Sequence, residues 1–357
     1  MIAPIFSSKE NFRQHFQQGL IELLKNDELG VFILGLANAS FDQDIYDFTK
    51  EKLLNRFYQL KDTYQKAILD GQQLNVPDDD LMVFLKLLAI SIDHIKPTQF
   101  RKEGLWLMQF NHIRSLRPAR MTQHKQTGIN QPYDVNGFSF NKPFLQKEMF
   151  WQGYLLNKEI SIFYNKFPFV QFHSLLVPDK ALGLNQFLTK DYHEYIWQLT
   201  GQLAENLPGL GIAYNSYGAF ASVNHLHFHL YIYEQPLPVM HNIWSHNISN
   251  EKIKQKSYPI QCEIFDNKNR AWEFIEQLHN LEIAYNLIYQ DNKLYCLVRK
   301  HQSNTNLPNW CSGLGWYEMS GGFTTFNMSD FTTLTHDTLY KTLSELKITT
   351  IEPKDRI

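Results

Sequence analysis

The 357-residue sequence predicts an α+β fold, made of two similar halves with antiparallel sheets and covering helices behind a helical N-terminal part. Three observations lead to this prediction. The first hundred residues repeat apolar side chains at helical spacing, whereas the chain from about Trp106 consists of short runs rich in β-branched and aromatic residues, bounded by Gly, Pro and Asn. The third observation is a Tyr-Asn … Leu-Val pattern that occurs twice.

Three helices are predicted in the N-terminal part. Apolar residues recur every three or four positions over residues 11–24 and 45–69. Pro77 is followed by three aspartates, which is a helix start with negative charge in the first turn, and that helix should run to about residue 93. No catalytic pattern is present here, so we expect a structural or lid-like role.

The remainder predicts strands over 159–164, 172–177, 212–214 and 225–233, with an amphipathic helix over 189–207. Tyr164-Asn165 with Leu176-Val177 is repeated as Tyr285-Asn286 with Leu297-Val298, each read as two antiparallel strands joined by a turn. The second copy has no clustered histidines, so only the first should be catalytic. The predicted divisions are a helical region 1–100, a catalytic half 101–245 and a non-catalytic half 246–357.

The composition excludes several classes of function. The 34 Lys and Arg nearly balance the 36 Asp and Glu, so no overall field attracts nucleic acid or an acidic membrane. The longest apolar runs, near 29–36 and 81–92, are too short to span a bilayer, and no signal peptide is visible. The three cysteines are widely spaced and lack zinc spacing, as expected in a reducing cytosol. We therefore expect a soluble, cytoplasmic protein with no cofactor.

The strongest signal is a run of three histidines that alternate with large apolar residues, His225-Leu226-His227-Phe228-His229. In a strand, alternate residues point to the same face, so the three imidazoles would share one side. Three interpretations compete: a histidine-rich surface face, a metal site that a distant residue completes, and covalent nucleotidyl transfer through histidine. Imidazole titrates near neutrality, so one ring can be a nucleophile while another donates a proton. We favour the third interpretation.

This pattern resembles the histidine-triad superfamily. The segment 214–228 is similar to the active-site segment of the GDP-hexose phosphorylases, the plant GDP-L-galactose and animal GDP-D-glucose enzymes of the galactose-1-phosphate uridylyltransferase branch. Residues 165–178 look like the strand, turn and strand that open a histidine-triad domain. Weaker likenesses lie at 114–118, 136–142 and 316–321. The resemblance covers about 106–340 and implies that the two halves are histidine-triad-like.

The resemblance implies a role for each candidate residue. His227 would attack the α-phosphorus of a nucleoside diphosphate derivative, His229 would donate to the phosphoryl group or the leaving oxygen, and His225 would orient its neighbours. Asn215 and Ser222 are candidates for contacts with phosphate or the leaving group, and Gly218 would let the backbone approach the ligand closely. Asn165 is a candidate for contact with the ribose, and His173 would support the triad. Positive charge could come from Arg114, Arg117, Arg120 and Lys142, of which Arg114 and Lys142 are the preferred candidates. No metal is expected.

One departure from the family pattern matters. Transferases and phosphorylases of this branch usually end the triad with Gln, whereas here the position is His229, as in hydrolase branches. The leading prediction is a nucleotidyltransferase or phosphorylase that acts on a nucleotide sugar such as a GDP-hexose, with inorganic phosphate as acceptor. The alternatives are a nucleotidyl hydrolase that uses water and a nucleotide-binding interaction protein.

Overall fold

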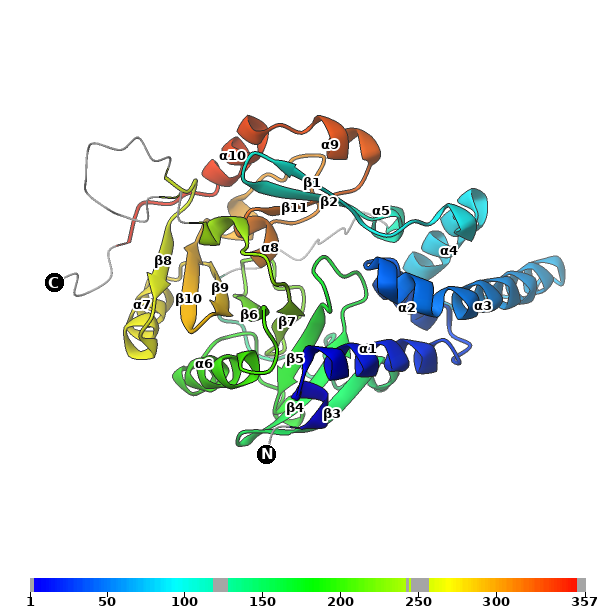
Figure 1. Ribbon diagram of the computed structural model, residues 1–357, viewed down its shortest axis with the longest axis horizontal. Helices are drawn as coiled ribbons and strands as arrows, with labels where there is room; N and C mark the ends of the chain where they lie inside the picture. The colour runs from blue at the N-terminus through cyan, green and yellow to red at the C-terminus, as the bar shows by residue number, and fades with distance from the viewer. Residues whose placement is uncertain (1–2, 118–127, 242–243, 245–256, 352–357) are drawn as a thin grey trace.

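The chain folds into a helical N-terminal region, one large sheet and one small sheet, as Figure 1 shows. The structure is a computed structural model and describes residues 3–117, 128–241, 244 and 257–351. The described architecture confirms the predicted α+β class with a helical N-terminal part.

The N-terminal region contains α1 (Lys9–Leu23), α2 (Leu29–Ala39), α3 (Gln43–Leu69) and α4 (Asp78–Ile90). Side-chain oxygens of Ser8 and Asp42 accept backbone N–H bonds at the starts of α1 and α3. The three predicted helices are confirmed. The sequence analysis missed α2, because ten of its eleven residues are buried and the segment therefore lacks the polar stripe that reveals an amphipathic helix.

The large sheet has eight strands in the order β3-β4-β5-β7-β6-β9-β10-β8, and every neighbouring pair is antiparallel. Its strands are β3 (Met149–Leu155), β4 (Lys158–Tyr164), β5 (Ser174–Pro178), β6 (Leu210–Asn215), β7 (Phe228–Ile232), β8 (Cys262–Phe265), β9 (Tyr285–Gln290) and β10 (Lys293–Val298). Helix α6 (Lys190–Ala204) packs on β6 and β9, and α7 (Lys268–Asn280) packs on β8.

The order of strands repeats outward from the β6–β9 junction. On one side lie β6, β7 and β5, and on the other lie β9, β10 and β8. Each set follows the chain order strand, helix, strand, strand, with α6 in one and α7 in the other. The sheet therefore consists of two halves with the same connectivity.

The alignment that led to the duplication is wrong in register. The 121-residue offset equates β4 and β5 with β9 and β10, but the first hairpin precedes α6 whereas the second follows α7. By position in the fold, the counterpart of β9 and β10 is the pair β6 and β7. Buried strands share apolar residues and polar ends, so a short Tyr-Asn … Leu-Val pattern recurs at positions that are not equivalent.

Alternate residues of the central strands enter different cores. Phe228 and Leu230 of β7 belong to a large core shared with α1, α2, α6 and α7. Tyr231 belongs to a second core with Trp316, and the ring of His229 lies 6.1 Å from the ring of Trp316. The sheet thus holds the triad strand between two apolar layers.

The second core is closed by the small sheet, in the order β1 (Gln99–Glu103), β2 (Trp106–Phe110) and β11 (Gly322–Thr325). β2 pairs with β1 antiparallel but with β11 parallel, so residues from far along the chain meet at this sheet. The remaining described helices are α5 (His112–Leu116), α8 (Trp316–Met319), α9 (Met328–Thr333) and α10 (His336–Ser344), and the 3-10 helices are Pro4–Phe6, Ile92–His94, Pro143–Glu148, Lys180–Leu182, Pro238–Met240 and Gln302–Asn304.

The predicted strands and the helix after Leu188 are found, with one correction at the triad. The strand expected over 225–233 is shorter, because β7 begins at Phe228. The segment ahead of it bonds to a loop instead of a strand: Leu226 N–H donates to Leu184 O at 2.8 Å. Only His229 of the triad therefore lies within a strand.

The predicted domain division stays a prediction. The division at residue 100 falls inside β1, and the division at residue 245 lies outside the described residues. Pairing of β6 with β9 and of β2 with β11 joins the two predicted halves.

Helix α1 is fixed to the large sheet by a buried phenol, which gives a test of the fold. Tyr164 Oη donates to Phe16 O at 2.6 Å, and a Cβ atom at Gly19 would lie 2.2 Å from that oxygen. Gly19→Ala should therefore lower the free energy of unfolding by about 1–3 kcal/mol through overpacking, despite the roughly 1 kcal/mol that Ala gains over Gly in a helix. Urea unfolding measures the change.

The matched test is the double variant with Tyr164→Phe, which removes the clashing hydroxyl. Tyr164→Phe alone should cost about 1 kcal/mol through the lost hydrogen bond. In the double variant, the loss should be clearly smaller than the sum of the single losses. Gln18→Ala, at an exposed position of α1, is the control. Additive losses would contradict the packing of α1 on Tyr164.

Candidate active site

The backbone holds the ring of His227 in one orientation. His227 Nδ1 lies 2.7 Å from His225 O, and a carbonyl oxygen can only accept, so Nδ1 carries the proton. The other ring nitrogen, Nε2, then keeps its lone pair in the neutral imidazole. His227 is 3% exposed, so its side chain is almost fully withdrawn from water.

Gln186, which the sequence analysis missed, locks the segment ahead of β7. Its Oε1 accepts from His227 N at 2.9 Å, and its Nε2 donates to His227 O at 3.1 Å and Asn215 O at 2.9 Å. The side chain is 1% exposed. Its bonds replace those that a neighbouring strand would make, so the backbone of His227 is fixed although this residue lies outside β7. No local sequence signal marks this glutamine, since its partners lie 29 and 41 residues away.

A buried polar chain runs from the loop after β4 through the third histidine. Asn165 Nδ2 lies 3.1 Å from His173 Nε2, and His173 Nε2 lies 2.9 Å from His229 Nδ1. His229 Nε2 lies 3.5 Å from the amide nitrogen of Asn215. The rings of His227 and His229 lie 5.5 Å apart, so the structure brings together His227, His229, His173, Asn165 and Asn215, and their roles stay predictions.

Burial keeps these imidazoles neutral. Desolvation lowers the pKa of His227 and of His225 to about 4, and for His225 the neighbouring His227 lowers it further. Desolvation also lowers the pKa of His229 and of His173 well below the ordinary value, with a smaller contribution from His173 to His229 and from Arg114 to His173. A neutral His227 has a free lone pair at physiological pH.

The loop between β6 and the triad rests on the second half of the chain. Gly218 has φ +88°, and a Cβ atom there would lie 2.2 Å from the ring of His301. Gln302 N donates to Gly218 O at 2.7 Å, and Phe220 N donates to Gln302 Oε1 at 2.5 Å. Glycine is therefore required at residue 218 to admit His301, whereas close approach to a ligand stays a prediction.

The basic candidates lie at different distances from the triad. Arg114 is buried, donates to Phe167 O at 2.8 Å and lies over the ring of Phe169. Arg117 donates to Ser312 Oγ at 3.2 Å, and Lys142 Nζ donates to Asn136 O at 3.2 Å. Neither of these two contacts involves a triad histidine.

Two further candidates remain without a contact that supports their predicted role. Ser222 is exposed in the loop that precedes the triad. Arg120 lies outside the described residues. Asn165 Oδ1 accepts from Phe167 N at 3.1 Å and so stabilises its own turn, and contact with a ribose stays a prediction.

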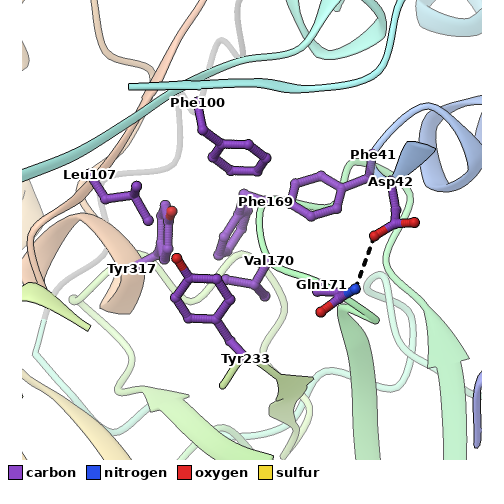
Figure 2. Close-up of a pocket in the computed structure, with 9 residues that line it drawn as sticks. All are labelled: Phe41, Asp42, Phe100, Leu107, Phe169, Val170, Gln171, Tyr233 and Tyr317. Atoms are coloured by element: carbon purple, nitrogen blue, oxygen red, sulfur yellow. Dashed lines mark hydrogen bonds between the residues drawn. The ribbon is translucent and has the colours of Figure 1, made fainter. Parts of the chain in front are cut away.

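Phe169 is one of the residues that line a cavity of about 190 Å³. Figure 2 shows these lining residues. The walls of the cavity are mostly aromatic, with Asp42 Oδ2 accepting from Gln171 Nε2 at 2.9 Å on one side. The ring of Phe169 lies 4.2 Å from the ring of His173 and so separates the cavity from the triad. The volume is below the roughly 300–1,000 Å³ of typical small-molecule sites, so we do not place a nucleotide there.

No group of three or more His, Cys, Asp or Glu side chains in the described part of the chain is arranged to hold a metal ion. Among the helices of the same residues, none is long and apolar enough to cross a membrane.

The buried imidazoles predict how stability changes with pH. In the unfolded chain a histidine binds a proton near pH 6.5, whereas His193, His225, His227 and His279 in the folded chain do so only near pH 4. Between these values the unfolded state binds more protons, so the free energy of unfolding should fall as the pH falls, by roughly 1.4 kcal/mol per pH unit for each group. Glu148 and Glu318, with pKa raised to about 7 by burial, act in the opposite direction but are fewer.

Urea unfolding between pH 7 and 5 measures this slope. The midpoint should decrease steadily on acidification. His279→Gln, outside the triad, is the matched variant. It removes one titrating group, so it should reduce the change in the free energy of unfolding by up to about 1.4 kcal/mol per pH unit. A midpoint that stays constant from pH 7 to 5 would contradict the buried, neutral state of these rings.

Comparisons with known proteins match the same region of the chain. Residues 102–231 match the family model described as GDPGP1-like, N-terminal domain. GDP-D-glucose phosphorylase 1 of Macaca fascicularis is 35% identical over 149 residues, which are 38% of this chain and 36% of that protein. GDP-L-galactose phosphorylase 2 of Arabidopsis thaliana is 23% identical over 282 residues, 68% of this chain and 64% of that protein.

A yeast Ap4A phosphorylase is similar in structure, with a TM-score of 0.49, 16% identity, and coverage of 77% of this chain and 97% of that one. The chain spans about a third of the first of the two sequence relatives and just under two thirds of the second. The matched range contains the triad, Asn215 and Asn165. Residues 102–231 are therefore similar to the N-terminal domain of GDPGP1-like proteins, which confirms the resemblance to GDP-hexose phosphorylases found in the sequence.

Proposed function

We propose that the chain is an enzyme that phosphorolyses a nucleotide sugar of the GDP-hexose type. The observation that carries this proposal is the bond from His227 Nδ1 to His225 O, because it leaves Nε2 as a neutral nucleophile in a buried site. The names of the sequence relatives support GDP-hexoses as the substrate class.

The reaction would take two displacements at the α-phosphorus. In the first, His227 Nε2 forms a bond to phosphorus and the bond to the bridging oxygen breaks, which releases a hexose 1-phosphate. In the second, an oxygen of inorganic phosphate attacks the same phosphorus, the P–N bond breaks, and the nucleoside diphosphate leaves. Splitting one displacement into two gives ping-pong kinetics.

The neighbouring side chains would stabilise the charge on the phosphoryl oxygens. Asn215 presents its amide nitrogen 3.5 Å from His229 Nε2, and we assign that role to these two groups. Ser222 and Gly218 of the preceding loop are proposed to approach the phosphates, and Asn165 to contact the ribose. Arg114 and Lys142 are proposed to contribute positive charge, with Arg114 acting from its position over Phe169. A cytoplasmic location also stays a prediction.

Hydrolysis by water is the second candidate function, and His229 is the observation that favours it. A glutamine amide at this position could hold the phosphoryl oxygens but could not deliver a proton, whereas an imidazole that the bound phosphate causes to take up a proton can do both. The third possibility, a nucleotide-binding interaction protein, would require the histidines to be inert, and the buried and oriented His227 speaks against it.

The test of the proposal is turnover of a panel of nucleotide sugars and dinucleotides with and without inorganic phosphate. A nucleoside diphosphate that forms only with phosphate identifies a phosphorylase, and a monophosphate that forms without it identifies a hydrolase. His227→Ala should reduce either activity by several orders of magnitude, because loss of a covalent nucleophile removes the pathway. Residual activity above a few per cent would exclude His227 as the nucleophile, provided that urea unfolding shows an intact fold.

The acceptor is tested by His229→Gln. If the imidazole directs water to the intermediate, the variant should hydrolyse its nucleotidyl–histidine bond more slowly. Intact-protein mass spectrometry measures the lifetime of the adduct, which adds the mass of one nucleoside monophosphate. Equal lifetimes and equal partitioning between water and phosphate in the two proteins would show that His229 does not set the acceptor.

A further inference from the structure

The junction between the two halves of the sheet brings two asparagines into contact beside the triad. Asn215 ends β6, Asn286 lies near the start of β9, and the two are register partners across the antiparallel pair. Asn286 is fully buried, although it belongs to the half that has no clustered histidines. A polar side chain this deep in an apolar sheet must make hydrogen bonds, since an unpaired one costs about 1–3 kcal/mol.

Two backbone groups fix which way both amides point. Trp316 N–H donates at 2.9 Å to the side-chain oxygen of Asn215, which identifies that atom as Oδ1. Ala219 O accepts at 3.0 Å from the side chain of Asn286, which identifies the donor atom as Nδ2. The 2.7 Å bond between the two side chains therefore runs from Asn286 Nδ2 to Asn215 Oδ1.

This bond decides what Asn215 presents to the triad. With Oδ1 occupied by two donors, the amide nitrogen must face the other way, and it lies 3.5 Å from His229 Nε2. We propose that Asn286 is a positioning residue of the second half, which turns the Asn215 N–H donors toward the phosphoryl group that His227 attacks. This inference rests on the proposed function for the step it accelerates.

The same side chain also steadies the loop that precedes the triad. Asn286 Nδ2 uses its second hydrogen on Ala219 O, in the loop that Gln302 and His301 hold from the other side. Donors that are already oriented when substrate binds need no reorganisation during the reaction, which is the condition for electrostatic stabilisation of a transition state. The half without clustered histidines would thus contribute to catalysis without touching the substrate.

The first variant is Asn286→Leu, which has a similar shape and no donor. The side-chain oxygen of Asn215 would then be held by Trp316 N–H alone, and we expect kcat to fall roughly tenfold to a hundredfold with KM within about threefold. Ser216→Ala is the matched control, since Ser216 Oγ accepts from Tyr285 N at 3.0 Å across the same junction without contact to the Asn215 amide. It should lower stability by a similar amount and leave kcat nearly unchanged.

Asn286→Asp distinguishes positioning from packing. When ionised, this side chain has no hydrogen to give to Asn215 Oδ1, and when protonated it has one. Activity relative to wild type should therefore recover as the pH falls, a dependence that a merely structural defect would not show. A constant ratio of variant to wild-type activity across pH 8 to 6, together with a wild-type kcat in Asn286→Leu, would overturn the inference.

A double-variant cycle with Asn215→Ala tests whether Asn286 acts through Asn215. In that background, Asn286→Leu should change kcat by less than about twofold, because the group it orients is gone. Multiplicative effects would mean that Asn286 acts by another route, and would also overturn the inference.

A measurement without substrate keeps this inference separate from the proposed function. The side-chain amide signal of Asn215 can be followed by ¹⁵N NMR in asparagine-labelled protein and assigned by its loss in Asn215→Ala. Asn286→Leu should shift this signal and reduce its protection from hydrogen exchange, whereas Ser216→Ala should leave it in place. If wild type turns over no nucleotide sugar, the proposed function fails, and the amide signal of Asn215 then tests the positioning role by itself. A signal that is unchanged in Asn286→Leu would overturn that role.

Discussion

The active-site geometry depends on the bond between His227 Nδ1 and the carbonyl of His225. It forces one tautomer on a ring that could otherwise adopt either, and so it selects Nε2 as the atom that can react. The bond forms because the segment ahead of β7 is held by Gln186 and not by a neighbouring strand, which lets the chain place this carbonyl under the ring. Burial then removes competing water and keeps the ring neutral.

The apolar layers on both sides of the sheet make this burial possible. Phe228 and Leu230 anchor β7 in the core shared with α1 and α6, while Trp316 covers the side on which His229 lies. Buried polar groups are tolerated only when they are paired, and the chain of contacts through His173, His229 and Asn215 meets that condition. The fold thus permits a polar site in an apolar interior because these polar side chains contact one another at hydrogen-bonding distance.

The two halves of the sheet share their connectivity but differ in the side chains they carry. The first half supplies the histidines, and the second supplies His301, Gln302, Trp316 and Asn286 as supports for the loop and the amide next to them. The surroundings of the histidines are therefore formed in part across the junction of β6 and β9. The small sheet also joins the two halves of the chain, because β2 of the first half pairs with β11 of the second.

The sequence by itself determined part of the secondary structure and the position of the three histidines. Helical spacing and alternation are local patterns, so α1, α3, α4 and α6 and the strands β4 to β7, β9 and β10 could be predicted from the sequence. Asn215, Asn165 and His173 became candidates only through the family resemblance. Helix α2 could not be predicted, because a segment buried on all sides has no periodic signal.

Only the tertiary structure decided how these groups are oriented. Gln186 bonds to a residue 41 positions away, Asn286 to one 71 positions away, and Trp316 to one 101 positions away. Each of these residues is ordinary in its local context and gains its role from a contact that only the tertiary structure creates, with Gln186 in a loop, Asn286 in β9 and Trp316 in α8. The same reason explains the wrong register of the repeat: equivalence of the two halves is a property of connectivity and strand order, whereas short matching motifs reflect only the shared composition of buried strands.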